Sequence, residues 1–232
     1  MVDLPRCRRA TWAEVDRWAD AVAERVRVAG RWPETIVGLT RGGWVPARLL
    51  TDRLGVRRLV SLRVQHWGVT AARDGAARLT EGLSGAIADE AVLVVDDITD
   101  TGESLRLASE HVRAAGPRSL ETAALVHIAH SRFVPTYFGE EIPRDAWVWV
   151  VFPWNYWEDL TSLASRAAAI APGADAVRST LRERCGLEVP AEDVVRVLAG
   201  DANPSSSAAP PPAPASGSAG GSSRRRSPAR GR

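Results

Sequence analysis

The chain has 232 residues, and its 30 basic side chains, all of them arginine, nearly balance 28 acidic ones. Five of the arginines lie after residue 203, so the remainder is slightly acidic and offers no basic surface for a specific nucleic-acid partner. No apolar run approaches the roughly 20 residues of a membrane helix, no signal peptide is visible, and Cys7 and Cys185 have no disulfide or metal spacing, so we expect a cytoplasmic protein without a membrane partner.

The first half of the chain alternates between helix and strand patterns. Thr11 and Glu14 have the spacing of a capping box, and apolar residues then recur at helical spacing until Gly30. The pattern further along predicts a strand at 35–39, a tight loop at 40–43, a helix at 46–54, a strand at 59–64 and a long polar loop with a weak hairpin at 65–90.

The second half continues the alternation. It predicts a strand at 91–96, a helix at about 102–115, apolar strand segments at 119–128 and 146–152, and two or three short helices within 156–200, the last from Glu192 to Leu198. Such an order is typical of an α/β fold with a mostly parallel twisted sheet flanked by helices. Ligands of these sheets bind at the carboxyl ends of the strands.

Residues 92–104 are the most informative segment. Val92–Val95 predicts a buried strand, which ends on the adjacent carboxylates Asp96 and Asp97, and Asp100 follows. Helix N-termini leave backbone N–H groups unpaired, so a helix that begins directly after this edge would bind a phosphate group. Helix capping explains one carboxylate well but not three, so we favour a phosphate site with acidic neighbours over a plain capped helix. The loop that begins the helix contains Thr99, Thr101, Gly102, Glu103 and Ser104.

A second motif, Thr40-Arg41-Gly42-Gly43, precedes this segment by one strand–helix unit. Glycine allows the backbone to approach a ligand closely, and a guanidinium group suits phosphate oxygens. Alone, the motif is equally compatible with an ordinary strand-to-helix turn. Because it falls, like Asp96 and Asp97, at the carboxyl end of a predicted strand, it strengthens the prediction of a phosphate site.

Together these motifs resemble the type I phosphoribosyltransferases, and most closely the microbial and archaeal hypoxanthine or xanthine-guanine enzymes. The resemblance implies that Arg41 and Gly42 bind the diphosphate of phosphoribosyl diphosphate, with a cis peptide between them. It implies that Asp96 and Asp97 bind the ribose hydroxyls and lie near a magnesium ion (Mg²⁺), and that Asp100 is the general base. The 5′-phosphate would bind to the loop residues Thr99, Thr101, Gly102, Glu103 and Ser104.

The resemblance also covers the segment Ala146–Asn155, which is similar to the purine-binding strand of this branch. It implies that Trp149 stacks on the base, with Trp147 as the alternative, and that Val150 and Asn155 lie beside it. Asn155 stands where the family usually has an acidic residue, which Glu158 or Asp159 could replace. The family's lysine for the 6-oxo group is replaced by Ile128, and the candidate substitutes are His127, His130 and Arg132.

The expected organisation is a phosphoribosyltransferase domain at 8–160, a helical extension at 161–200 and a disordered tail at 201–232. A mobile hood loop beginning at His66-Trp67-Gly68 would cover the bound sugar. The implied reaction transfers the phosphoribosyl group of phosphoribosyl diphosphate to a free 6-oxopurine (hypoxanthine, guanine or xanthine), giving a nucleotide and diphosphate, and the family suggests a homodimer or homotetramer. Two alternatives stay open: a sensor of phosphoribosyl diphosphate or nucleotides, and a transferase for another base.

Overall fold

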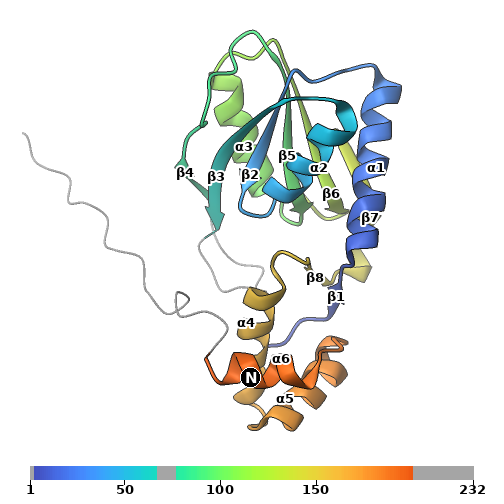
Figure 1. The fold of residues 1–232 in the computed structure, drawn as a ribbon, viewed down its shortest axis with the longest axis vertical. Helices are drawn as coiled ribbons and strands as arrows, with labels where there is room; N and C mark the ends of the chain where they lie inside the picture. The colour runs from blue at the N-terminus through green and yellow to red at the C-terminus, as the bar shows by residue number, and fades with distance from the viewer. Residues whose placement is uncertain (1–2, 67–76, 201–232) are drawn as a thin grey trace, which may run out of the picture.

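The chain folds around a six-stranded sheet in a computed structural model that describes residues 3–66 and 77–200 (Figure 1). The strand order is β4-β3-β2-β5-β6-β7; β3 and β4 pair antiparallel, and the other neighbours pair parallel. The mostly parallel α/β sheet predicted from the sequence is therefore confirmed. The strands are β2 (Thr35–Thr40), β3 (Arg58–His66), β4 (Ala77–Glu81), β5 (Ala91–Thr99), β6 (Ser119–Ile128) and β7 (Tyr137–Ile142).

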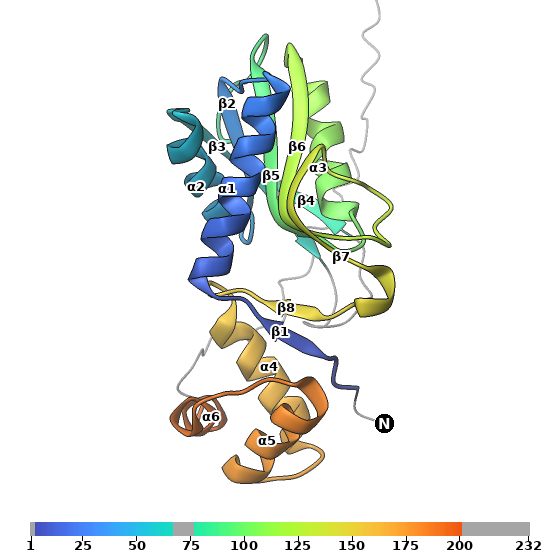
Figure 2. The ribbon, with the colours of Figure 1, turned by 90° about the vertical axis from the view of Figure 1, so that its right-hand side faces the viewer.

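Helices cover both faces of this sheet. Helices α1 (Trp12–Ala29) and α2 (Trp44–Leu54) pack on one face, and α3 (Glu103–Ala114) packs on the other (Figure 2). The capping box of α1 is present, because the Glu14 main-chain N–H donates to Thr11 Oγ1 and the Thr11 main-chain N–H donates to the Glu14 carboxylate. Each helix thus buries its apolar side against β2, β5 or their neighbours, which fixes the strand ends that carry the motifs.

A second, two-stranded sheet lies beyond the carboxyl ends of the main strands (Figure 1). It pairs β1 (Cys7–Arg9) with β8 (Trp149–Val151) in parallel. The apolar run at 146–152 therefore forms only a short strand outside the main sheet, and its first residue, Ala146, ends a 3₁₀ turn, η1 (Arg144–Ala146). Strands β1 and β7 were not predicted, because apolar and polar residues do not alternate clearly in these short segments.

The helical extension packs under this small sheet as one apolar cluster. It consists of α4 (Tyr156–Ala168), α5 (Ala174–Thr180), a π-helical turn η2 (Leu181–Cys185) and α6 (Ala191–Leu198). Trp149 and Val151 of β8 pack against it, as does the free thiol of Cys7. Residue 160 lies inside α4, so the expected limit between domain and extension falls within a helix of this cluster.

Two expectations concern residues outside the described part. The hood loop was predicted to begin at His66-Trp67-Gly68; His66 ends β3, and Trp67 and Gly68 belong to the segment 67–76, while the tail corresponds to 201–232. Among residues 3–66 and 77–200, no helix is both long and apolar enough to cross a membrane.

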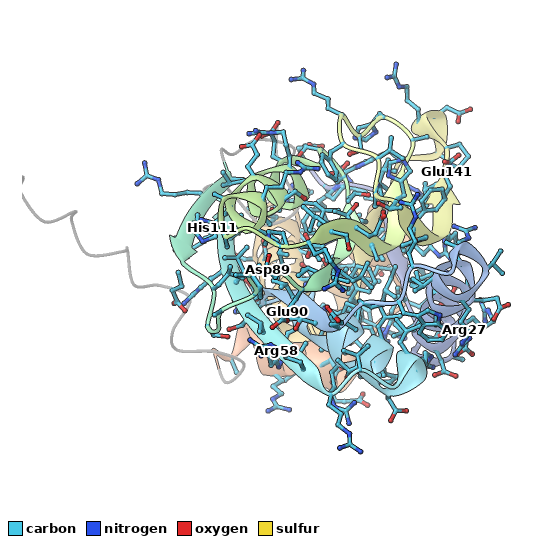
Figure 3. All side chains as sticks on the ribbon, turned by 90° about the horizontal axis from the view of Figure 1, so that it is seen from above. Arg27, Arg58, Asp89, Glu90, His111 and Glu141 are labelled. Carbon is cyan, nitrogen blue, oxygen red and sulfur yellow. The ribbon has the colours of Figure 1, made fainter. Side chains whose placement is uncertain are left out.

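Charged side chains such as Arg58 and Glu90, which form an ion pair, lie at the end of the sheet opposite the motifs (Figure 3).

Candidate active site

The Arg41–Gly43 loop and the Asp96–Asp97 edge meet at the carboxyl ends of β2 and β5. These strands are parallel neighbours with Gly38 opposite Val95, so both chains leave the sheet at the same edge. A methyl group added to Gly42 would lie 2.6 Å from Asp97 Cγ, a separation that real side chains do not reach. Glycine at residue 42 therefore lets the loop backbone touch the carboxylate, and the structure unites the two motifs.

The two carboxylates are buried side by side, each with 8% of its residue surface exposed. The Asp97 main-chain N–H donates to Asp96 Oδ1 at 3.0 Å, and the Ile98 N–H donates to Asp97 Oδ1 at 2.9 Å. Burial, with the neighbouring Asp97, raises the pKa of Asp96 well above its usual value, and burial also raises the pKa of Asp97. Hydroxyl donors or a cation would favour the charged forms, so this edge is suited to a polyhydroxyl ligand or a metal ion.

Magnesium needs oxygen ligands but commonly takes only one or two carboxylates from the protein, the remainder coming from phosphates and water. Asp96 and Asp97 provide two carboxylates on adjacent residues, buried at the edge where the ligand loops converge. Groups of three or more potential ligands are absent from residues 3–66 and 77–200. The residues present therefore fit a magnesium ion that is held jointly with a bound diphosphate, and not a site formed by the protein alone.

The loop between β5 and α3 is the segment predicted to bind the 5′-phosphate. Gly102 has φ +83°, and a methyl group there would lie 2.5 Å from Ser131 Oγ, so both conformation and space require glycine. Thr101 accepts a hydrogen bond from the Glu103 N–H at 3.4 Å, while the Glu103 carboxylate pairs with Arg106. The first turn of α3, which includes Ser104, begins directly at this loop, and the N-terminus of a helix favours a phosphate group.

The Thr99 side chain lies in the core, and its hydroxyl does not belong to the loop that begins α3. Its residue is 1% exposed, and its hydroxyl lies 2.8 Å from His127 Nδ1. His127 is itself buried, and that burial lowers the pKa of its imidazole. The hydroxyl of Thr99 is therefore occupied by His127, which leaves its backbone as the part that can contact a ligand.

Two side chains contact the same carboxylate oxygen of Asp100. His130 Nε2 lies 2.7 Å from Asp100 Oδ1, and the indole N–H of Trp147 donates to the same oxygen at 3.1 Å. The three residues come from the ends of β5, β6 and η1. His130 and Trp147 were predicted only as alternatives for binding the base. No pattern in the sequence indicated that they contact Asp100.

The predicted base-binding residues point in different directions. Trp149 packs against the apolar cluster of the extension, whereas Val150 belongs to the cluster of α1 and β6. Ile128 is fully buried in that second cluster and offers no polar group. Asn155 directly precedes α4, where its main-chain carbonyl accepts a hydrogen bond from the Asp159 N–H at 2.9 Å. Among the aromatic candidates it is Trp147, and not Trp149, that the structure brings to Asp100.

The two acidic residues that could compensate for Asn155 differ in their surroundings. Glu158 forms an ion pair with Arg41 of the diphosphate loop. Asp159 is buried, and burial raises its pKa to about 7, although the adjacent Trp149 indole lowers it. Asp159 Oδ2 and Trp149 Nε1 have no hydrogen-bond partner within the described part of the chain. The Glu158 side chain thus contacts a residue of the candidate site, whereas the Asp159 side chain is buried in the extension.

Trp154, which was not among the predicted site residues, contacts the carboxylate edge. Its indole N–H donates to Asp97 Oδ2 at 3.2 Å, and its ring stacks on Phe152 with centroids 4.8 Å apart. A tryptophan beside a proline gives no local indication of such a contact, because the contact joins residues 57 positions apart.

The expected cis peptide is found one bond earlier than predicted. The prediction of a cis bond between Arg41 and Gly42 is wrong, because the cis bond joins Thr40 and Arg41. Neither bond precedes proline, so the residue types gave no preference between them.

Comparisons with known proteins agree with this geometry. A model of the phosphoribosyl transferase domain matches residues 9–166. The chain is 32% identical to the purine phosphoribosyltransferase from Pyrococcus horikoshii Ot3, with a TM-score of 0.55 over 64% of this chain and 93% of that one.

Two more distant structures share the fold alone. The xanthine-guanine-hypoxanthine phosphoribosyltransferase of Helicobacter pylori is 20% identical, with a TM-score of 0.52 over 69% of this chain and 99% of that one. A hypothetical protein from Neisseria gonorrhoeae with bound ppGpp is 17% identical, with a TM-score of 0.53 over 68% and 93%. With a matching family model over two thirds of its length and both phosphate motifs joined at one sheet edge, the chain belongs to the phosphoribosyltransferase family.

Proposed function

We propose that the protein transfers the phosphoribosyl group from phosphoribosyl diphosphate to a free 6-oxopurine, namely hypoxanthine, guanine or xanthine, giving a nucleoside monophosphate and diphosphate. The contact of Gly42 with Asp97 is the observation that carries this proposal, because it joins a diphosphate loop to a hydroxyl-binding edge. The 32% identity with the Pyrococcus horikoshii purine enzyme supports the choice of a purine.

The phosphoribosyl group would lie across the carboxyl ends of β2 and β5. The N–H groups at the start of α3 hold its 5′-phosphate, and Asp96 and Asp97 accept hydrogen bonds from the two ribose hydroxyls. The Arg41 guanidinium and the backbone at Gly42 bind the diphosphate and stabilise the negative charge that grows there as it leaves. Asp96 and Asp97 would hold a magnesium ion together with the diphosphate, and the ion would supply further neutralisation of that charge.

Asp100 would act as general base. The N–H bond of the purine imidazole ring breaks, and its proton passes to a carboxylate oxygen of Asp100. The electron pair left on the base drives attack on the anomeric carbon, and the bond from that carbon to the diphosphate oxygen breaks with its electron pair on the diphosphate. The base lies against Trp147, which contacts Asp100, and not against Trp149, whose ring packs into the extension.

The decisive test is release of diphosphate by the purified chain with magnesium, phosphoribosyl diphosphate and one base at a time. We expect release with at least one of hypoxanthine, guanine and xanthine, and none with adenine or uracil. Release only with adenine or uracil would keep the transferase and refute the 6-oxopurine assignment. Binding of the sugar diphosphate without turnover of any base would instead indicate a sensor.

Two further properties accompany this proposal as predictions. We expect a cytoplasmic enzyme that forms a homodimer or homotetramer, which sedimentation velocity would test. The absence of a membrane-spanning helix from the described residues is compatible with that location.

A further inference from the structure

Asp100 is held asymmetrically. Both of its observed contacts are to Oδ1: His130 Nε2 lies 2.7 Å from it, and the Trp147 indole N–H donates to it at 3.1 Å. No other described residue forms a hydrogen bond or an ion pair with Oδ2. One oxygen is therefore fixed by the protein and the other is available to a ligand.

The fold builds this arrangement from neighbouring strand ends. β5 and β6 pair in parallel with Thr99 opposite His127, so the residues that follow each strand emerge side by side. The Ser131 N–H donates to the Ile128 carbonyl at 2.9 Å, closing a tight turn around His130. The Arg132 N–H donates to the Thr101 carbonyl at 3.2 Å, which ties this turn to the loop between β5 and α3.

The environment of His130 differs from that of its neighbour His127. His127 is 3% exposed and bonded to Thr99, as a core residue is. The His130 and Asp100 side chains retain 21% and 26% of their surface, so their contact lies where a ligand can reach it. A histidine between the core and the open edge, bonded to a carboxylate, is suited to orienting that carboxylate.

We propose that His130 and Trp147 are positioning residues for Asp100. By fixing Oδ1 they stop rotation of the carboxylate and direct Oδ2 toward the N–H of the incoming base. Pre-orientation of this kind matters because a misplaced catalytic group loses rate even when the substrate still binds. The inference rests on the proposed function, since it assigns Asp100 the role of base.

The kinetic test compares the full-length chain with His130→Ala, His130→Gln and Trp147→Phe. Replacement of His130 by alanine should lower kcat about 10- to 100-fold while KM for phosphoribosyl diphosphate changes less than about 3-fold. Glutamine, which can place an N–H near the position of Nε2, should restore most of the rate, and free imidazole should partly rescue the alanine variant. Trp147→Phe keeps a ring but removes the N–H, and should cost about 3- to 10-fold in kcat.

The matched control is His111→Ala, which changes a histidine on α3 away from the site (Figure 3) and should leave both constants unchanged. An unchanged kcat in His130→Ala would overturn the proposal, as would equal loss in the glutamine and alanine variants. A parallel rise in KM for phosphoribosyl diphosphate would also overturn it, because it would indicate general damage to the site.

A second measurement does not depend on turnover and so separates this inference from the proposed function. Nitrogen-15 NMR of the imidazole rings should show His130 protonated at Nε2, and Asp100→Asn should shift the His130 ring signals but not those of His111. If the wild type transfers to no base yet these signals respond, the contact stands and the transferase assignment fails. If the signals do not respond, the positioning role is refuted whatever the activity.

Discussion

The two halves of the candidate site are built differently. The phosphoribosyl half uses two short continuous segments, Arg41–Gly43 and Asp96–Ser104, at the ends of adjacent parallel strands. The base half gathers Asp100, His130 and Trp147 from three separate chain segments, and its predicted aromatic strand belongs to another sheet. The first half depends on local backbone geometry and the second on tertiary packing, so they should respond differently to substitution.

The halves also differ in how much freedom their residues retain. In the phosphoribosyl half, glycine at 42 and 102 is required by space, and added carbon would strike Asp97 or Ser131. In the base half, tertiary packing sets the direction of each tryptophan side chain. Trp149 packs against the extension, whereas the Trp147 indole N–H donates to Asp100. The following substitutions test this contrast.

The largest effect should come from Asp100→Asn, because a general base cannot be replaced by an amide. We expect kcat to fall about 10²- to 10⁴-fold, with KM for phosphoribosyl diphosphate nearly unchanged. Steady-state kinetics with both substrates varied would measure this. Asp89→Asn, at a site labelled in Figure 3 on the opposite end of the sheet, is the matched control. Equal loss of turnover and sugar-diphosphate binding would contradict the general-base role.

Gly42→Ala should come next and should damage the phosphoribosyl half selectively. The new methyl group would displace Asp97 or the loop, so we expect kcat/KM for phosphoribosyl diphosphate to fall about 100-fold with the fold retained. Circular dichroism and kinetics would establish both points. In Gly82→Ala the added carbon would lie 3.7 Å from its nearest neighbour, His111 Nε2, so this control should behave as the wild type. Normal activity of the Gly42→Ala variant would refute a close approach of the loop backbone to the Asp97 carboxylate.

Asp159→Asn tests the packing of the base half against the extension. The folded-state pKa of Asp159 is raised to about 7 from an ordinary value of 3.8, so its stability contribution is present at low pH and is lost as the pH rises through about 7. Between pH 5 and pH 8 the free energy of unfolding of the wild type should fall by roughly 2–3 kcal/mol. The Asp159→Asn variant should not show this fall.

Urea unfolding at the two pH values would measure that difference. The exposed Asp175, in the same extension, provides the control Asp175→Asn, which should keep the wild-type pH dependence. If Asp159→Asn destabilises the protein equally at both pH values, the carboxyl group is not the pH-dependent element.

The smallest effect should come from Glu158→Gln. Without substrate, Glu158 pairs with Arg41, and both side chains are largely exposed, so the pair contributes little to stability. Freeing Arg41 should lower KM for phosphoribosyl diphosphate about 2- to 5-fold, since exposed pairs are worth less than about 1 kcal/mol. A rise in KM would show instead that Glu158 replaces the acidic residue missing at Asn155. Glu188→Gln, an exposed change in the extension, is the control.

The sequence by itself determined the parallel α/β fold, the capped first helix and the phosphoribosyl motifs. Each of these depends on local rules, such as hydrophobic periodicity, side-chain capping and the conformational freedom of glycine, that are readable over a dozen residues. Their boundaries in the structure differ little, as with the helix predicted at 102–115 and observed at Glu103–Ala114.

Only the tertiary structure decided which side chains meet in the base half. It placed the segment around Trp149 in a second sheet, brought His130 and Trp147 to Asp100, and paired Glu158 with Arg41. These contacts span 30 to 117 positions, and they depend on which apolar cluster covers each strand. Local sequence patterns specify that a residue is apolar or aromatic, but the element packed against it determines the direction of its side chain.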